Sequence, residues 1–284
     1  MAPESPPSSP VNWREKQTLG RTGLRVSRLG LGASYPAPAA SFEAAFERGV
    51  NYFYWGSYRR SPMRDALRHI AAQHRDELVI VLQSYARQGT LMRLSIQRAL
   101  RQLRMEYSDV LLLGWHNGAP SPAILEASLE LKRRGLVRHI ALSGHKRTLF
   151  PTLLEHEAID IWHVRYNAVH RGAEGEVFPT LEALPTDRRP GVVTYTTTRW
   201  GHLCDPRRVP ANERPPQGTD CYRFALSNPH VDLAIAGPAD ARQMDAALHA
   251  LELGPMDAEE LAWMRRVGDH IYQGDRSSKV RDRV

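Results

Sequence analysis

The strongest constraint on the fold is the alternation of short apolar runs with longer stretches of helical periodicity. Helical periodicity is clear in Ser41–Arg48, Leu91–Leu103, Pro122–Arg134 and Asp240–Leu251. Alternation of this kind is typical of βα units with parallel strands. The apolar runs are Arg28–Gly32, Asn51–Tyr54, Leu78–Leu82, Asp109–Leu113, Val137–Leu142, Ile159–Val164, Gly191–Tyr195 and Asp232–Ile235. Eight strands are the number that a closed (β/α)8 barrel needs, so the sequence predicts an α/β protein with a TIM barrel fold.

Segments at the two ends of this pattern predict additions to the barrel. The stretch KQTLGRTGLRVSRLGLG has alternating apolar positions around two glycines and predicts a β-hairpin. A further helix is expected at Asp257–Tyr272, beyond the eighth strand. The Pro/Ser-rich start predicts a disordered tail over residues 1–14. The barrel is then expected over residues 15–275, with a frayed tail at 276–284.

Composition narrows the class of protein. The chain has 284 residues, 42% of them hydrophobic, which suits one large core. The net charge is +7, but the arginines are spread through amphipathic helix patterns, so a solvated basic surface is expected and nucleic-acid binding is not. Cys204 and Cys221 lack metal or disulfide spacing and are expected to be reduced thiols. No apolar run or leader pattern predicts a membrane segment, so a cytoplasmic protein is expected.

Functional groups of a (β/α)8 barrel lie at the C-terminal ends of its strands. The stretch GVNYFYWGSYRR, residues 49–60, passes from a strand directly into an aromatic and cationic loop. Three tryptophans near strand ends would suit a flat or apolar molecule, and the arginines would suit an anionic group. The predicted substrate-binding residues are Trp55, Arg59, Arg60, Trp115, Arg165 and Asn167. An unpaired buried guanidinium is costly, so Arg165 is expected to have an anionic partner from the protein or a ligand.

Several segments resemble the aldo-keto reductases over nearly the whole chain. GVNYFYWGSYRR resembles that family's G-V-N-F-F-D-T-A-x-x-Y-G, and GLVRHIALSGH resembles G-K-I-R-x-I-G-V-S-N. IDIWHVRYNAVHRGAE resembles Q-x-x-Y-N-x-x-x-R-x-x-E, and PGVVTYTTTRWG resembles G-I-x-V-x-A-Y-S-P-L-x-x-G. The N-terminal hairpin and FALSNPHVDLAIAGPADARQM resemble the family too. The resemblance implies a (β/α)8 barrel that transfers hydride between a nicotinamide cofactor and a carbonyl or alcohol.

The resemblance also implies a degenerate catalytic tetrad. Tyr54 stands at the family's Asp, Gln83 at its Lys, and Gly114 at its His. Tyr58 lies one position before the family's Tyr, and His116 follows Gly114 by two residues. The predicted catalytic residues are Tyr58, His116, Gln83 and Tyr54, with Arg59 or Arg60 supplying the missing positive charge. The alternatives are an aromatic wall for Tyr58, a surface-loop histidine for His116 and structural packing for Tyr54.

Cofactor contacts are carried over by the same resemblance. Ser143 matches the family residue that hydrogen-bonds the nicotinamide carboxamide, and Tyr195 matches the aromatic residue on which the ring stacks. Gly144 replaces the family's Asn and His163 replaces its Gln. Contacts to the cofactor phosphates are implied for Arg199, Gly237, Arg242 and Gln243. NADP(H) is expected, NAD(H) less so, and no metal. Surface charge is the alternative for both arginines.

Two functions are compatible with this sequence. The first is an NADP(H)-dependent oxidoreductase of aldo-keto reductase type that acts on a small-molecule carbonyl or alcohol with a non-standard acid/base set. The second is a non-redox barrel that has lost hydride transfer, either a lyase or isomerase, or a ligand-binding pseudoenzyme. The family resemblance implies a monomer. Preserved cofactor contacts favour the first function, and the replaced tetrad favours the second.

Overall fold

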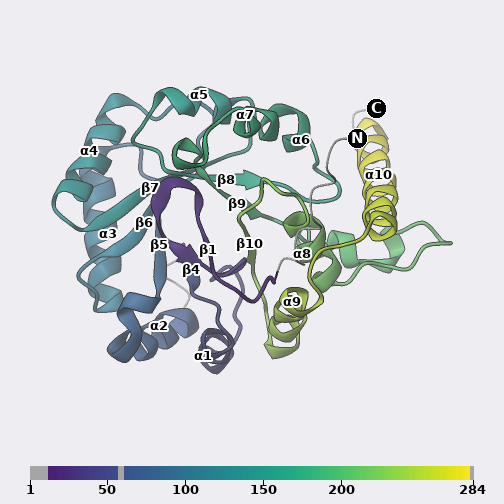
Figure 1. The fold of residues 1–284 in the computed structure, drawn as a ribbon, viewed down its shortest axis with the longest axis horizontal. Coiled ribbons are helices and arrows are strands. Elements are labelled where there is room, and N and C mark those ends of the chain that lie inside the picture. Colours follow the sequence, from purple (N-terminus) through teal and green to yellow (C-terminus); the bar gives the residue numbers. More distant parts are fainter. Residues whose placement is uncertain (1–11, 57–60, 282–284) are drawn as a thin grey trace, which may run out of the picture.

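A closed barrel of eight parallel strands forms the centre of the protein (Figure 1). The computed structural model describes residues 12–56 and 61–281, with side chains up to residue 275. The strands follow the order β10-β3-β4-β5-β6-β7-β8-β9 around the barrel. Their bounds are β3 Leu29–Gly32, β4 Tyr52–Trp55, β5 Val79–Ser84, β6 Ser108–Leu113, β7 Val137–Gly144, β8 Ile161–Arg165, β9 Gly191–Tyr195 and β10 Leu233–Ala236. All eight predicted strands are present, which confirms the TIM barrel.

The predicted hairpin closes the end of the barrel at which the strands begin. Its strands, β1 Gln17–Thr18 and β2 Arg25–Val26, pair antiparallel across the 3-10 helix η1 Gly20–Thr22. Leu19 and Val26 are fully buried and pack with the side chains inside the barrel. At Gly20 the backbone has φ 46° and lies so close to the start of β9 that a Cβ would meet the Gly191 nitrogen at 2.2 Å. The hairpin therefore fills this end, and the opposite end remains for a site.

Helices surround the barrel on its outer face (Figure 1). Gly49 and Gly135 follow two of these helices and have positive φ, 97° and 71°, which is typical of a glycine that ends a helix. The helices are α1 Ala39–Glu47, α2 Ser61–His74, α3 Gly89–Leu103, α4 Pro122–Arg133, α5 Leu149–Thr152, α6 Ala173–Glu176, α7 Phe178–Glu182, α8 Gly218–Leu226, α9 Ala241–Leu253 and α10 Ala258–Arg281. Short 3-10 helices are η2 Arg75–Glu77, η3 Leu153–Glu155, η4 Thr186–Arg188, η5 His202–Cys204 and η6 Pro206–Arg208.

Alternation along β4 separates two cores. Tyr52 belongs to the cluster inside the barrel, and Tyr54 packs against that cluster. Phe53 and Trp55 belong to the larger cluster between the barrel and its helices. Successive strand side chains point to opposite faces of a sheet, so Tyr52 and Tyr54 are the β4 residues that point into the barrel.

Ordered elements extend up to and past both predicted domain boundaries, which stay predictions. Trp13 lies in the expected tail, but its ring is 3% exposed and packs under the guanidinium of Arg28. At the other end α10 continues to Arg281, past the predicted boundary at residue 275, because the stretch from 272 to 281 contains no proline to stop it. No helix within the described residues is both long and apolar enough to cross a membrane. Cys204 and Cys221 are free thiols, as expected, with their sulfurs 3.9 Å apart.

Candidate active site

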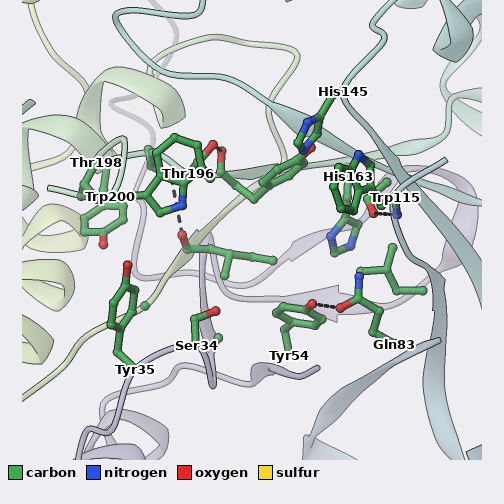
Figure 2. A pocket seen from close by; sticks show the side chains of 18 of the residues that line it. Ser34, Tyr35, Tyr54, Gln83, Trp115, His145, His163, Thr196, Thr198 and Trp200 are labelled. Carbon is green, nitrogen blue, oxygen red and sulfur yellow. Dashed lines mark hydrogen bonds between the residues drawn. The ribbon is translucent and has the colours of Figure 1, made fainter. Parts of the chain in front are cut away.

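A cavity of about 460 Å³ opens at the C-terminal ends of the strands (Figure 2). Its described lining contains no Asp, Glu, Lys or Arg. The lining residues are Gly32, Ser34, Tyr35, Tyr54, Gln83, Tyr85, Leu112, Trp115, Ser143, His145, His163, Tyr195, Thr196, Thr197, Thr198, Trp200, Tyr222, Ile235 and Gly237. This size suits a small molecule or part of a cofactor. The walls are phenols, imidazoles, indoles and hydroxyls, so recognition here depends on hydrogen bonds and ring packing.

Tyr54 and Gln83 form the polar centre of the cavity floor. The Tyr54 hydroxyl donates a hydrogen bond to Oε1 of Gln83, and Figure 2 shows the two side chains pointing toward each other. Burial raises the pKa of Tyr54, and the electrostatic effect and hydrogen bond of Tyr85 raise it further. The glycine at 114 makes room for this arrangement, because a Cβ there would lie 2.4 Å from Nε2 of Gln83 and 2.8 Å from the Tyr85 ring. Tyr54 is thus a protonated phenol fixed by an amide.

Below this centre His163 is fixed by Tyr52. The Tyr52 hydroxyl and Nε2 of His163 lie 3.0 Å apart, and both side chains are buried. Burial lowers the pKa of His163 to about 3, so the imidazole is neutral at neutral pH. His163 therefore forms this hydrogen bond with Tyr52 as a neutral ring.

One wall of the cavity is a stack of three rings. The His145 ring lies 5.5 Å from the Trp115 ring and 6.3 Å from the Tyr195 ring. Tyr195 is held by a 3.1 Å hydrogen bond from its hydroxyl to the Gly144 carbonyl. Oγ of Ser143 accepts a 3.0 Å hydrogen bond from the Trp115 amide, which leaves the serine hydroxyl able to donate. The predicted nicotinamide residues Ser143, His163 and Tyr195 therefore line one cavity with Tyr54 and Gln83.

The opposite wall lies on a backbone segment with unusual dihedral angles. Thr196, Arg199 and Trp200 have φ of 56°, 52° and 55°, and Trp115 across the cavity has φ 55°. Left-handed backbone is uncommon for residues other than glycine and concentrates at functional sites. Figure 2 shows Tyr35 and Trp200 on this side of the cavity and Trp115 on the other. Gly237 lies beside Tyr35, where a Cβ would come within 3.2 Å of the ring.

Several predicted site residues lie outside the cavity. His116 borders a second hollow, with Arg87 and Asn117, and burial and Arg87 lower its pKa to about 4. Trp55, predicted to contact substrate, is 1% exposed and packs between the barrel and the helices. Asn167 is buried and supports the wall, because its Nδ2 donates to the Thr196 carbonyl at 2.9 Å. The catalytic role of His116 stays a prediction.

Residues predicted to contact the cofactor phosphates have mixed surroundings. Arg199 pairs with Asp275, while its Nε and Nη1 are buried with no hydrogen-bond partner in the described structure. Arg242 is exposed at the start of α9. The Gln243 side chain binds its own segment, because its amide oxygen accepts a hydrogen bond from the Ala239 nitrogen at 3.0 Å. Tyr58, Arg59 and Arg60 fall outside the described residues, so their roles stay predictions.

Some cavity residues were not predicted from the sequence. Tyr85 comes directly after Gln83 and Ser84, so its place at the end of β5 was the available signal. Ser34 and Tyr35 follow β3 in the same way. Tyr222 reaches the cavity from α8, and nothing in its local sequence marks it. No group of three or more potential metal ligands occurs among the residues whose placement is described.

Comparison with known proteins places this site in a family. The model of the Aldo/keto reductase family matches residues 32–205, which is more than half of the chain. The protein therefore belongs to the aldo/keto reductase family. The match covers the strands from the end of β3 through β9, together with most of the residues that line the cavity.

Individual relatives are distant. L-galactose dehydrogenase from Arabidopsis thaliana is 23% identical over 296 residues, covering 87% of this chain and 92% of the relative. A holo-form aldo-keto reductase from Bacillus halodurans superposes with a TM-score of 0.74 at 20% identity, covering 89% of this chain and 96% of the other. An aldo/keto reductase from Klebsiella pneumoniae in complex with NADP and acetate gives 0.73 at 19% identity, covering 90% and 96%. Both structures confirm the fold.

Proposed function

We propose that the protein is an NADP(H)-dependent oxidoreductase that interconverts a carbonyl compound and an alcohol with a non-standard acid/base set. The observation that carries the proposal is that Tyr195 and Ser143 line the same cavity as Tyr54. An aromatic face, a free hydroxyl donor and a fixed phenol thus surround one space. Family membership and the NADP complex of the Klebsiella pneumoniae relative support a nicotinamide as the cofactor.

The residues present fit such a cofactor. Tyr195 would stack on the nicotinamide ring, and the Ser143 hydroxyl would donate to its carboxamide. Gly237 leaves room for close approach of a phosphate, and the unpaired nitrogens of Arg199 suit a pyrophosphate oxygen. Arg242 supports the choice of NADP(H) over NAD(H), because an exposed guanidinium suits a 2′-phosphate.

The chain's own contribution to the reaction is proton transfer at Tyr54. NADPH supplies a hydride when bound, and the oxygen of the reduced carbonyl then needs a proton. Tyr54 provides it, since an alkoxide is a stronger base than even a buried phenolate. Gln83 orients the hydroxyl, and Tyr85, which is 58% exposed and lines the same cavity, returns a proton from solvent. This path replaces the Tyr, Lys and His of the family pattern.

A titration with NADPH and NADH, followed by tryptophan fluorescence, tests the cofactor directly. Trp115 and Trp200 line the cavity, so we expect saturable quenching by NADPH and much weaker quenching by NADH. Trp200→Phe is expected to reduce the quenching amplitude while leaving the affinity similar. If neither dinucleotide binds, the oxidoreductase proposal is wrong, and the alternative of a non-redox barrel takes its place.

The pH dependence of reduction tests Tyr54. An acid with an ordinary tyrosine pKa loses its proton above about pH 10, and the rate of reduction then falls. The pKa of Tyr54 is raised, so the protonated form persists at higher pH and we expect no fall at that point. The measurement is kcat/KM for NADPH-dependent reduction of 4-nitrobenzaldehyde as the pH rises. A decline centred near 10 would assign proton donation to another tyrosine.

A further inference from the structure

Three arginines lie at or just after the C-terminal ends of the neighbouring strands β7, β8 and β9, beside the ring wall of the cavity. Arg165 ends β8, Arg147 lies in the loop after β7, and Arg199 lies in the loop after β9. Burial lowers the pKa of Arg165; Tyr195 opposes this effect, and Arg147 and Arg199 lower the pKa further. The same three arginines act on His170, whose pKa falls to about 4, with burial as the main cause. These groups therefore form one positive cluster.

Two of these arginines have acidic partners. Arg147 donates to Glu176 at 2.7 Å, and Arg199 pairs with Asp275. Arg165 differs from both, because none of its nitrogens makes a hydrogen bond or an ion pair within the described part of the chain. The anionic partner expected for Arg165 from the sequence is thus not supplied by the described residues. Arg165 is partly buried, and a partly buried cation without a counter-charge destabilises the fold.

Unpaired polar nitrogens concentrate at this cluster. The Nε atoms of Arg147, Arg165 and Arg199, Nη1 of Arg199 and Nδ1 of His170 are all buried without a partner in the described structure. Other arginines also have a buried, unpaired Nε, but each of them has at least one other nitrogen that is hydrogen-bonded. Arg28 donates to the Leu226 carbonyl at 3.0 Å, and Arg75 donates to Asp109 at 3.0 Å. Among the arginines whose Nε is buried without a partner, only Arg165 has no acceptor for any of its nitrogens within the described residues.

The cluster adjoins the cavity that we assign to substrate and cofactor. In the register of the barrel Arg165 pairs with Tyr195, which lines the cavity. Arg165 also acts electrostatically on His145, the middle ring of the wall. The cavity itself has no charged side chain in its described lining, so an anionic end of a ligand would be stabilised at this edge and nowhere else along the wall.

We infer that Arg165, with Arg147 and His170, forms an oxyanion subsite that binds a carboxylate or phosphate group of the substrate. Planar guanidinium groups bind both oxyanions through paired hydrogen bonds. Assigning the oxyanion to the substrate rests on the proposed function, but binding of an oxyanion at Arg165 does not. Such a group could come from the substrate or from the cofactor pyrophosphate. In the second case Arg165 and Arg199 would bind the pyrophosphate together.

Calorimetric titration with inorganic phosphate at constant ionic strength tests the subsite. We expect one phosphate to bind the full-length wild-type protein, both alone and with saturating NADPH. Arg165→Met is expected to weaken phosphate binding about ten- to a hundredfold, because a charge-assisted contact is lost. The control is Arg101→Met, which removes the same charge from the exposed face of α3. This variant should bind phosphate with wild-type affinity.

Thermal unfolding of the same variants gives a second readout. In phosphate-free buffer we expect Arg165→Met to unfold at or above the wild-type midpoint, because an uncompensated, partly buried charge is removed. Phosphate should raise the midpoint of wild type and of Arg101→Met, but not that of Arg165→Met. A lower midpoint for Arg165→Met without phosphate would reveal a partner within the protein and overturn the inference.

The remaining outcomes separate the subsite from the reductase proposal. Absence of phosphate binding, or equal binding by wild type and Arg165→Met, overturns the subsite. Loss of phosphate binding when NADPH is present assigns the cluster to the cofactor and overturns the substrate assignment. Phosphate binding that depends on Arg165, in a protein that binds no dinucleotide, supports the subsite and rejects the reductase.

Discussion

Tyr54→Phe is expected to lower kcat for NADPH-dependent reduction by about 10²- to 10⁴-fold, the range contributed by a positioned general acid. The change removes only the hydroxyl that Gln83 orients, and the ring keeps its place in the cavity floor. NADPH affinity should stay within a few-fold of wild type, because Tyr195 and Ser143 are untouched. Steady-state kinetics with 4-nitrobenzaldehyde and the fluorescence titration measure the two effects separately.

Two further variants decide which tyrosine is the acid. Tyr35→Phe removes a hydroxyl from the rim of the same cavity and should change kcat only slightly, so it is the matched control. Tyr58→Phe tests the tyrosine that the family resemblance favours. Full turnover by Tyr54→Phe together with inactivity of Tyr58→Phe would transfer proton donation to Tyr58.

Gly268→Ala is expected to destabilise the protein by about 2 kcal/mol or more, although alanine is the better helix former. Gly268 lies inside α10, where a Cβ would come within 2.1 Å of the Ala168 carbonyl oxygen and 3.1 Å of the Val169 nitrogen. The gain in helix propensity is about 1 kcal/mol, but the contact is with backbone, which cannot rotate away as a side chain can. Chemical denaturation measures the free energy of unfolding.

Gly274→Ala provides the control within the same helix. Nothing lies within 4 Å of a Cβ at Gly274, so the substitution is expected to stabilise the protein by up to about 1 kcal/mol. Changes of opposite sign in the free energy of unfolding for the two alanine variants would confirm that close packing of α10 against the loop after β8 holds this helix in place. If both variants were stabilising, α10 would not be in the contact described here.

The barrel was predictable because each buried strand is a short apolar run followed by a helical stretch. Gly191–Tyr195 has the predicted bounds, and the other seven strands differ by one or two residues at their ends. The short helices α5 to α7 were not predicted, since four or five residues are too few to show a helical period. Trp13 was placed in a tail because its partner, Arg28, is distant in the sequence.

The site was predictable where a strand positions the residue. Tyr54, Gln83, Ser143, His163 and Tyr195 were identified from strand ends and the family pattern, and all five line one cavity. Side-chain direction within a strand was harder to predict, which is why Trp55 was assigned to substrate. Contributions from helices and loops, such as that of Tyr222, depend on tertiary packing that no local pattern encodes.

The space beside Gly114 restricts which side chains position 114 can hold. The Gln83 amide and the Tyr85 ring occupy the volume that any side chain at position 114 would need. A histidine placed there alone would collide with both, and a lysine placed at 83 alone would put an ammonium beside the un-ionised phenol of Tyr54. Positions 83 and 114 are therefore coupled through shared space. A larger side chain at either position requires a compensating change at the other.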